Sequence, residues 1–331
     1  MAKKTFLKII VFCFGLGLIS VIAIFVLKPA VFEIRSLTTP SPEAEKPIKL
    51  VFTGDIMLDR GVEYQIQKQG ENDWRFPFLK IADKLNAADL VIGNLESQIS
   101  DKGSKVGSIY SFRADPEAIE GLTSVGFDVL SLANNHSFDY GKEALKDSLS
   151  RLISTNISPI GAGNENQAYA PVIKTIDNTR IAFFAYAEGP ETWKATENNI
   201  GIALVSDKTR DRIKTDISLA KDLSDLVIVS FHWGEEYAKE PSQFQKDLAK
   251  AVIDAGADLV IGSHAHVVQE SEIYNGHHIF YSLGNFVFDQ GFSEETLEGE
   301  IVEIAIENKK IKQVFPKRIK INEFFQPEPA L

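Results

Sequence analysis

The chain has 331 residues, enough for one large α/β domain with appendages. Its aromatic and charged fractions, 10% and 24%, are ordinary for a folded globular protein. The formal net charge of −11, without a basic stripe, argues against a nucleic-acid-binding surface. The single cysteine, Cys13, leaves the rest of the chain without disulfide or thiol chemistry.

The N-terminal segment predicts a membrane anchor. Residues 9–27 carry no charge, and as a helix they would extend roughly 28 Å, close to the hydrocarbon thickness of a bilayer. Lys3, Lys4 and Lys8 precede this run, so the positive-inside rule places the N-terminus in the cytoplasm and the following domain outside. A cleaved signal peptide is the alternative, but residues 28–32 lack a small-x-small cleavage pattern. A lipoprotein anchor at Cys13 is disfavoured because Phe12 precedes it.

We therefore expect three parts. Residues 1–28 form an uncleaved, single-pass anchor in the cell membrane, facing either a periplasm or the open cell surface. Residues 29–47, rich in Pro, Ser, Thr and Glu, form a flexible extracytoplasmic stalk. Residues 48–331 form the folded domain.

Within that domain, apolar runs alternate with amphipathic stretches as far as about residue 285, which indicates βαβ units and a largely parallel sheet. Helices are expected over residues 62–69, 76–86, 116–125, 141–155, 208–223 and 241–255. Two antiparallel hairpins are expected, one pairing 171–176 with 180–187 and the other pairing 300–307 with 311–321. This mixture fits a two-sheet α/β sandwich flanked by helices better than a simple doubly wound sheet.

Side chains that bind divalent metals follow five of the apolar strands. They are Asp55, then Asn94 with Glu96, Asn135 with His136, His232, and His264 with His266. Sites in open α/β sheets form at the carboxyl ends of the strands, where such groups converge. A single buried histidine is usually a hydrogen-bonded core residue, but so many at strand ends predict a metal site.

Six ordered motifs carry a family resemblance. GDIML, GNLE, LANNHSFDYG, HWGEEY, GSHAHV and YSLGNFVFD, spanning about residues 50–289, resemble the CapA family of bacterial capsule (poly-γ-glutamate) synthesis proteins. That family is similar to the calcineurin-like metallophosphoesterases. The resemblance implies a metallophosphatase-type sandwich that holds one or two divalent ions, whether Mn, Zn, Fe or Mg.

The resemblance also implies residue roles. His136 is the candidate general acid, and Asp139 orients it or raises its pKa. Met57 and Asn94 depart from the phosphoesterase pattern, which has a metal-binding residue at the first position and a bridging aspartate at the second, so Glu96 is expected to bridge. The implied metal ligands are Asp55, Glu96, Asn135, His232, His264 and His266.

Other residues are candidates for contacts with substrate or with the metal ligands. These are Asn94, Arg113 and Asn285. Glu235 and Glu236 either contact an amine or are solvated, and solvation is favoured for one of them.

The function implied is metal-dependent hydrolysis or transfer at a phosphate ester or amide-like bond during capsule or poly-γ-glutamate biogenesis. The alternative is a non-catalytic metal-binding protein that assembles with a capsule synthase or export complex or binds its polymer. The expected partners are those membrane components, an anionic polymer or phosphate-containing substrate, and the membrane itself, but no nucleic acid.

Overall fold

The computed structural model describes residues 46–330. The expected anchor at 1–28 and nearly all of the expected stalk at 29–47 lie outside the described residues. Within 46–330, no helix combines the length and the apolar character needed to cross a membrane.

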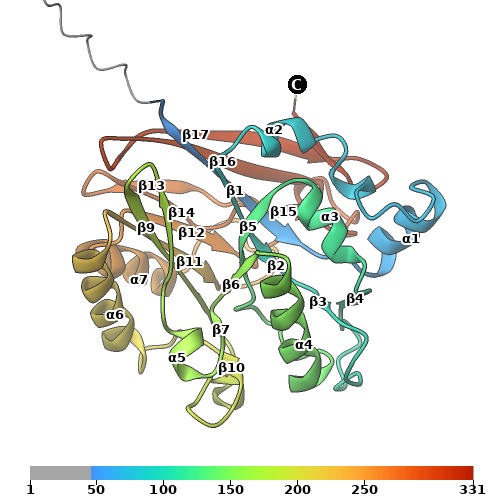
Figure 1. Ribbon diagram of the computed structural model, residues 1–331, viewed down its shortest axis with the longest axis horizontal. Coiled ribbons are helices and arrows are strands. Elements are labelled where there is room, and N and C mark those ends of the chain that lie inside the picture. The colour runs from blue at the N-terminus through green and yellow to red at the C-terminus, as the bar shows by residue number, and fades with distance from the viewer. Residues whose placement is uncertain (1–45, 331) are drawn as a thin grey trace, which may run out of the picture. The chain divides into compact units, whose positions relative to one another are not determined.

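Two large sheets form the centre of the described domain (Figure 1). The first has eight strands in the order β18 (Pro327–Pro329), β17 (Lys310–Ile321), β16 (Glu298–Glu307), β1 (Ile48–Ile56), β2 (Leu90–Leu95), β5 (Phe127–Ser131) and β6 (Ser158–Ile160), with β15 (Asn285–Val287) beside β1. The second has six, in the order β13 (Ser271–Tyr274), β14 (His277–Phe280), β12 (Leu259–Ser263), β11 (Leu226–His232), β9 (Thr179–Ala187) and β8 (Val172–Ile176). Two small pairs join β3 (Gln98–Ile99) to β4 (Arg113–Ala114) and β7 (Ala162–Gly163) to β10 (Gly201–Ile202).

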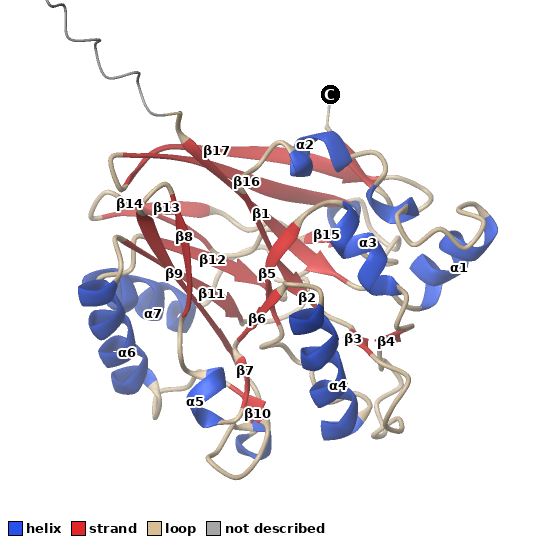
Figure 2. Ribbon diagram, viewed as in Figure 1, coloured by secondary structure: helices blue, strands red, loops and turns tan. Residues whose placement is uncertain are grey.

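Helices flank the sheets, as Figure 2 shows. They are α1 (Arg60–Lys68), α2 (Ala82–Asn86), α3 (Ala118–Ser124), α4 (Gly141–Ser154), α5 (Glu165–Ala168), α6 (Arg210–Leu223) and α7 (Gln243–Asp254), with 3-10 turns η1 (Phe76–Phe78), η2 (Glu191–Trp193) and η3 (Glu295–Leu297). The expected helix at 76–86 is divided into η1 and α2, because the Ile81 N–H donates to the Phe78 carbonyl, 3.1 Å away, in the tighter 3-10 pattern. The other five expected helices are confirmed within a few residues, and so is the mixed two-sheet architecture flanked by helices.

The second sheet lies between two hydrophobic cores. Along β9, Ile181 and Phe183 belong to the larger core, whereas Phe184 and Tyr186 belong to a smaller core shared with α6 and α7. Successive strand residues point to opposite faces of a sheet. The sheet is therefore covered by the first sheet's core on one face and by two helices on the other.

Both expected hairpins are confirmed, since β8 pairs with β9 and β16 pairs with β17 in antiparallel fashion. The remaining central strands are parallel: β1, β2, β5 and β6 in one sheet, and β9, β11, β12 and β14 in the other. Parallel strands share an edge at which all of their carboxyl ends emerge. That shared edge positions the site.

A close approach of backbones fixes β15 against β1. A Cβ atom at Gly54 would lie 2.0 Å from the Gly284 carbonyl oxygen, so only glycine fits there. The adjacent Asp55 N–H donates to that same carbonyl at 3.0 Å. As a result, Asp55 is in register with Asn285.

Candidate metal centre

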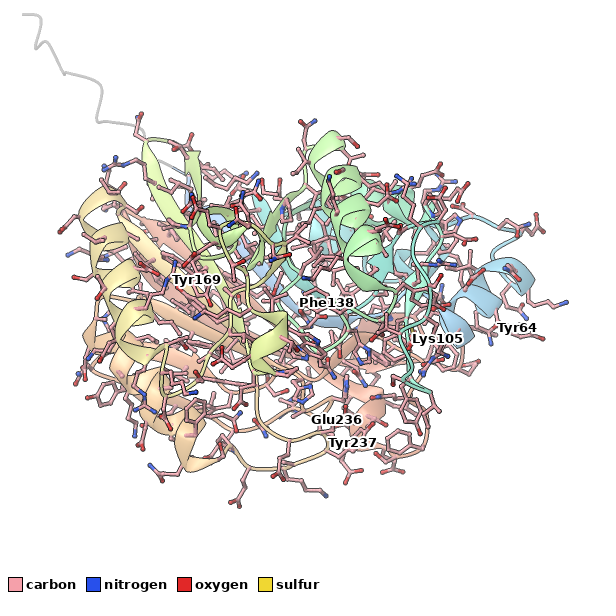
Figure 3. The ribbon with its side chains drawn as sticks, turned by 90° about the horizontal axis from the view of Figure 1, so that it is seen from below. Tyr64, Lys105, Phe138, Tyr169, Glu236 and Tyr237 are labelled. Atoms are coloured by element: carbon pink, nitrogen blue, oxygen red, sulfur yellow. The ribbon has the colours of Figure 1, made fainter. Side chains whose placement is uncertain are left out.

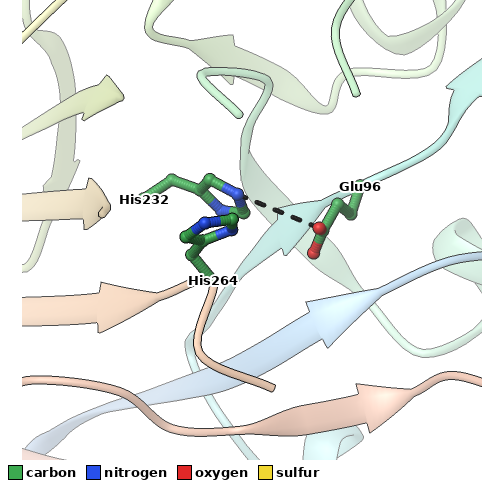
Figure 4. A group of neighbouring side chains, drawn as sticks. All are labelled: Glu96, His232 and His264. Carbon is green, nitrogen blue, oxygen red and sulfur yellow. Dashed lines mark ion pairs between the residues drawn. The ribbon is translucent and has the colours of Figure 1, made fainter. Parts of the chain in front are cut away.

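The structure gathers the side chains expected to bind metal at the carboxyl ends of the strands. Asp55 lies near the end of β1, Glu96 follows β2, and His232 ends β11. Asn135 and His136 follow β5, and His264 and His266 follow β12. Figure 4 shows Glu96 facing His232, with His264 beside it.

Glu96 lies at the middle of this cluster. Its side chain is fully buried, and its Oε1 atom has no hydrogen-bond partner among the described residues. The same oxygen lies 3.8 Å from the Nε2 atoms of His136 and His232, and 3.7 Å from Nε2 of His266. These separations are too long for hydrogen bonds.

Burial sets the protonation of the two inner carboxylates. It raises the pKa of Asp55 to about 7, although hydrogen bonds from Asn94 and from the His264 backbone oppose the increase. Burial also raises the pKa of Glu96 well above its ordinary value, and the negative charge of Asp55 adds to this effect. Without a cation, the pair is therefore poorly suited to carry two negative charges.

The histidines are shifted the opposite way. Burial lowers the pKa of His232 well below its ordinary value. It lowers the pKa of His264 to about 4 and that of His266 to about 3. Neutral imidazole is the form that binds metal. These histidines are already neutral near pH 7, so a metal ion would not have to displace a proton from them.

In two histidines, a hydrogen bond from Nδ1 to an acceptor oxygen orients the ring so that Nε2 faces Glu96. The Nδ1 atom of His266 lies 2.9 Å from Oδ1 of the fully buried Asn285, whose amide donates in turn to the Thr296 carbonyl. The Nδ1 atom of His136 lies 2.7 Å from Oδ2 of Asp139. Such a partner fixes the ring and leaves Nε2 free to act. Asn285 thus orients a predicted ligand.

Asn94 connects residues of the cluster that come from different sheets. Its Nδ2 donates to Oδ1 of Asp55 at 2.8 Å and lies 3.2 Å from Nδ1 of His232. Its Oδ1 accepts from Asn134. The Nε2 atom of His232 lies 2.9 Å from Oδ1 of Asn135. Asn94 therefore connects two of the predicted ligands, Asp55 and His232, through its amide.

Strained backbone supports the closing histidine pair. His264 and His266 have φ values of 94° and 57°, in the left-handed region that residues with a side chain rarely adopt. Such strain persists only where the surroundings impose it, and it is concentrated at functional sites. One imposing contact is the hydrogen bond from the His264 N–H to Asp55 Oδ2, at 3.2 Å.

Two other residues from the sequence analysis have structural contacts. Arg113 donates to the carbonyl of Lys102 at 2.9 Å, and its guanidinium covers the ring of Tyr140. Met57 is fully buried, and its sulfur accepts from the Asp59 N–H at 3.2 Å. Among the described residues, these contacts place Arg113 in the packing of its loop, and Met57 in the core.

Two supporting residues, Ser263 and Asn134, were not among those predicted from the sequence. The Oγ atom of Ser263 lies 3.1 Å from His232 Nδ1, and Asn134 Nδ2 donates to the Leu95 carbonyl at 2.8 Å as well as to Asn94. Ser263 immediately precedes His264, and Asn134 immediately precedes Asn135. In the sequence, only their position beside predicted ligands at the ends of strands could have indicated this supporting role.

The residues present fit a divalent cation. In three overlapping sets, one ligand atom from each member lies within 4.8 Å of the others. Ligands about 2.1 Å from a shared tetrahedral ion are separated by roughly 3.4 Å, close to the 3.7–3.8 Å between Glu96 Oε1 and the imidazoles. Glu96 Oε1 and His264 Nδ1 are buried and lack hydrogen-bond partners among the described residues, as ligand atoms awaiting an ion would. The sets are Glu96, His232 and His264; Asp55, Glu96 and His266; and Glu236, His264 and His266.

The fold and the site define an α/β sandwich with a candidate metal centre of histidines and carboxylates at its strand ends. More particularly, the chain belongs to the family described as bacterial capsule synthesis protein PGA_cap, whose model matches residues 49–290. This confirms the resemblance drawn from the six motifs.

Known proteins resemble this chain over most of its length. It is 33% identical to the PGA biosynthesis protein CapA of Bacillus subtilis (strain 168), over 82% of this chain and 73% of that protein. It is 34% identical to the capsule biosynthesis protein CapA of Bacillus anthracis, over 80% of this chain and 67% of that protein. A solved structure of a hypothetical protein from Thermus thermophilus matches with a TM-score of 0.52 and 16% identity, covering 85% of this chain and all of that one. This last likeness concerns the fold alone.

Proposed function

We propose that this protein acts in capsule or poly-γ-glutamate biogenesis as a metal-dependent hydrolase or transferase at a phosphate ester or amide-like bond. Its family and the names of its relatives support the pathway. The main support for metal-dependent chemistry is the environment of the buried Glu96 Oε1. This atom lacks a hydrogen-bond partner among the described residues and faces three imidazole Nε2 atoms at 3.7–3.8 Å.

One or two divalent cations would be held by the six residues Asp55, Glu96, Asn135, His232, His264 and His266. A bound cation supplies charge stabilisation at a phosphoryl or carbonyl oxygen and lowers the pKa of water. Two carboxylates balance two positive charges, so a second cation would require further negative charge from the protein or from an anionic substrate.

In this proposal, His136 donates a proton to the leaving group. Its Nε2 faces the cluster, its Nδ1 contacts Asp139, and its ring lies against Phe112 with the centroids 4.0 Å apart. The Asp139 carboxylate also accepts from the Phe112 N–H at 2.8 Å, which helps to hold the carboxylate beside Nδ1 of His136. As water adds to the reacting centre, it releases one proton to solvent and the bond to the leaving atom breaks. The leaving atom takes a proton from His136 Nε2, and solvent then restores the proton of His136.

Elemental analysis tests the site, with wild type measured beside His264→Ala and His136→Ala. Wild type should hold one or two equivalents of metal, and His264→Ala should lose it. In assays on a generic phosphodiester with Mn²⁺ or Zn²⁺, His136→Ala should reduce turnover by about 10²–10⁴-fold while keeping its metal. Metal without turnover would favour a binding or assembly component, and absence of metal under any supplementation would refute the site.

We also propose that residues 1–28 tether the domain outside the membrane. The charge-free run at 9–27 and the preceding lysines support this. The full chain should fractionate with membranes, and a fragment of residues 48–331 should not. Equal fractionation of the two would contradict the tether.

A further inference from the structure

We propose that Glu236 is a further metal ligand, which together with His264 and His266 forms a solvent-facing position for a second divalent cation. This inference rests on the proposed metal centre and adds to it a residue from a different loop. It assigns a role to one of the two glutamates for which the sequence analysis offered only an amine contact or solvation.

The three side chains already have the spacing of a ligand set. One ligand atom from each of Glu236, His264 and His266 lies within 4.8 Å of the others. His266 is buried, His264 is partly buried and Glu236 is exposed, so the set leads from the interior to the surface. A cation held there could exchange with solvent more readily than one held by the buried Asp55 and Glu96.

Hydrogen bonds fix the residues that precede Glu236 in its loop. Trp233 is fully buried and donates from Nε1 to the Tyr281 carbonyl at 3.0 Å. Gly234 follows with a φ of 86°, and its N–H donates to the Glu188 carboxylate at 2.6 Å. A Cβ atom at Gly234 would lie 2.7 Å from the Gln245 side chain, so this turn requires glycine.

The segment is anchored after Glu236 as well. The N–H of Tyr237 donates to the carbonyl of Ala265 at 2.8 Å, which joins this loop directly to the turn between the two histidines. Tyr237 adopts a left-handed φ of 64°, its ring lies 5.9 Å from that of His266, and its hydroxyl accepts from Gln290. The side chains of Tyr237 and Glu236 lie near each other in Figure 3. Glu236 is therefore positioned over the histidine pair by bonds on both sides.

The charge balance of a cation pair favours a third carboxylate. Asp55 and Glu96 offset two of the four positive charges of a cation pair, and Asn94 occupies the position at which a bridging aspartate would add another. A carboxylate at Glu236 leaves one net positive charge, which favours an anionic substrate group such as a phosphate.

The chain offers a matched control in Glu235, the adjacent exposed glutamate, which belongs to none of the ligand sets found among the described residues. The full chain would be stripped with chelator and titrated with Mn²⁺ by calorimetry and by electron paramagnetic resonance, which detects coupled Mn²⁺ pairs. Wild type and Glu235→Gln should bind two equivalents and show the coupled signal. Glu236→Gln should retain one equivalent and bind the second at least about tenfold more weakly.

Tyr237→Phe distinguishes metal binding by Glu236 from support by its neighbour, because this change removes the adjacent hydroxyl but keeps the Glu236 carboxylate. It should bind the second equivalent nearly as wild type does. Equal loss in Tyr237→Phe and Glu236→Gln, or undiminished binding in Glu236→Gln, would overturn the inference and leave the proposed function standing. A wild-type chain that binds no divalent metal under any supplementation would refute both.

Discussion

Glu96 and Asp55 are buried acids that lie beside histidines, and burial lowers the pKa values of two of these, His232 and His266. A buried carboxylate normally has a hydrogen-bond donor or a cationic partner. Here Asp55 accepts from Asn94 and from the His264 backbone, whereas Glu96 Oε1 accepts from none of the described residues. This arrangement of buried acids and neutral imidazoles favours the binding of a cation.

The raised pKa of Asp55 predicts pH-dependent metal affinity. Below its pKa of about 7 the folded, metal-free protein binds a proton at Asp55, and a cation must displace it. Affinity should therefore rise about tenfold per pH unit for each proton displaced, at least up to pH 7. The pKa values of His264 and His266 are about 4 and 3, so these two residues carry no proton that a cation would displace between pH 5.5 and 7.5.

Calorimetric titration with Mn²⁺ from pH 5.5 to 7.5, in buffers of different ionisation enthalpy, would measure both the affinity and the protons released. Net proton release of one or more at pH 6 is expected. A dissociation constant that stays unchanged across this range would contradict the protonation proposed for Asp55.

At the scale of elements, helix α7 follows the loop that carries Glu236, and its start is fixed by side chains. Ser242 and Gln245 form a capping box: Ser242 Oγ accepts from the Gln245 N–H at 3.3 Å, and Gln245 Oε1 accepts from the Ser242 N–H at 2.8 Å. Gln245 is buried and lies against Gly234. One local interaction thus connects the helix to the loop of the site.

Replacement of Ser242 by Ala should lower the free energy of unfolding by about 1 kcal/mol, because an N–H at the helix start loses its acceptor. Ser150→Ala is the control, since Ser150 is exposed in α4 and donates only to the Lys146 carbonyl within its own helix. Its effect should stay within about 0.5 kcal/mol. Urea denaturation measures the free energy of unfolding of both variants. Equal losses in the two would argue against a stabilising cap at Ser242.

At the scale of the whole molecule, the site depends on how β15 joins the two sheets. Asp55 in β1 is in register with Asn285 in β15, and Asn285 orients His266, which follows β12 in the other sheet. The Leu283 N–H, just before β15, donates to the Gly262 carbonyl of β12 at 3.1 Å. One short segment therefore connects a carboxylate of the first sheet to a histidine of the second.

Gly54→Ala should disturb this junction, since the new Cβ would meet a backbone oxygen that cannot move independently. We expect a loss of about 3 kcal/mol in the free energy of unfolding, together with weaker metal binding. Gly291→Ala is the control, because the nearest atom to a Cβ there is a Leu297 methyl at 4.0 Å. Denaturation and metal titration of both variants test this, and unchanged behaviour of Gly54→Ala would count against the junction.

Much of the fold could be predicted because its signals are local. The turn at Asp177, Asn178 and Thr179 between two apolar runs indicated the β8–β9 hairpin, and amphipathic periodicity indicated the long helices α4, α6 and α7. Elements of three or four residues were missed, including α5, β15 and β18, because periodicity needs a longer window.

By itself, the sequence determined the family, the mixed α/β architecture and the residue types at the strand ends, since each depends on neighbours along the chain. Only the tertiary structure decided that Asn285 orients His266, that Asn94 joins Asp55 to His232, and that Glu236 reaches the histidine pair. These relations connect residues far apart in sequence. They follow from the register between β1 and β15 and from the packing of one sheet against the other, which no local pattern encodes.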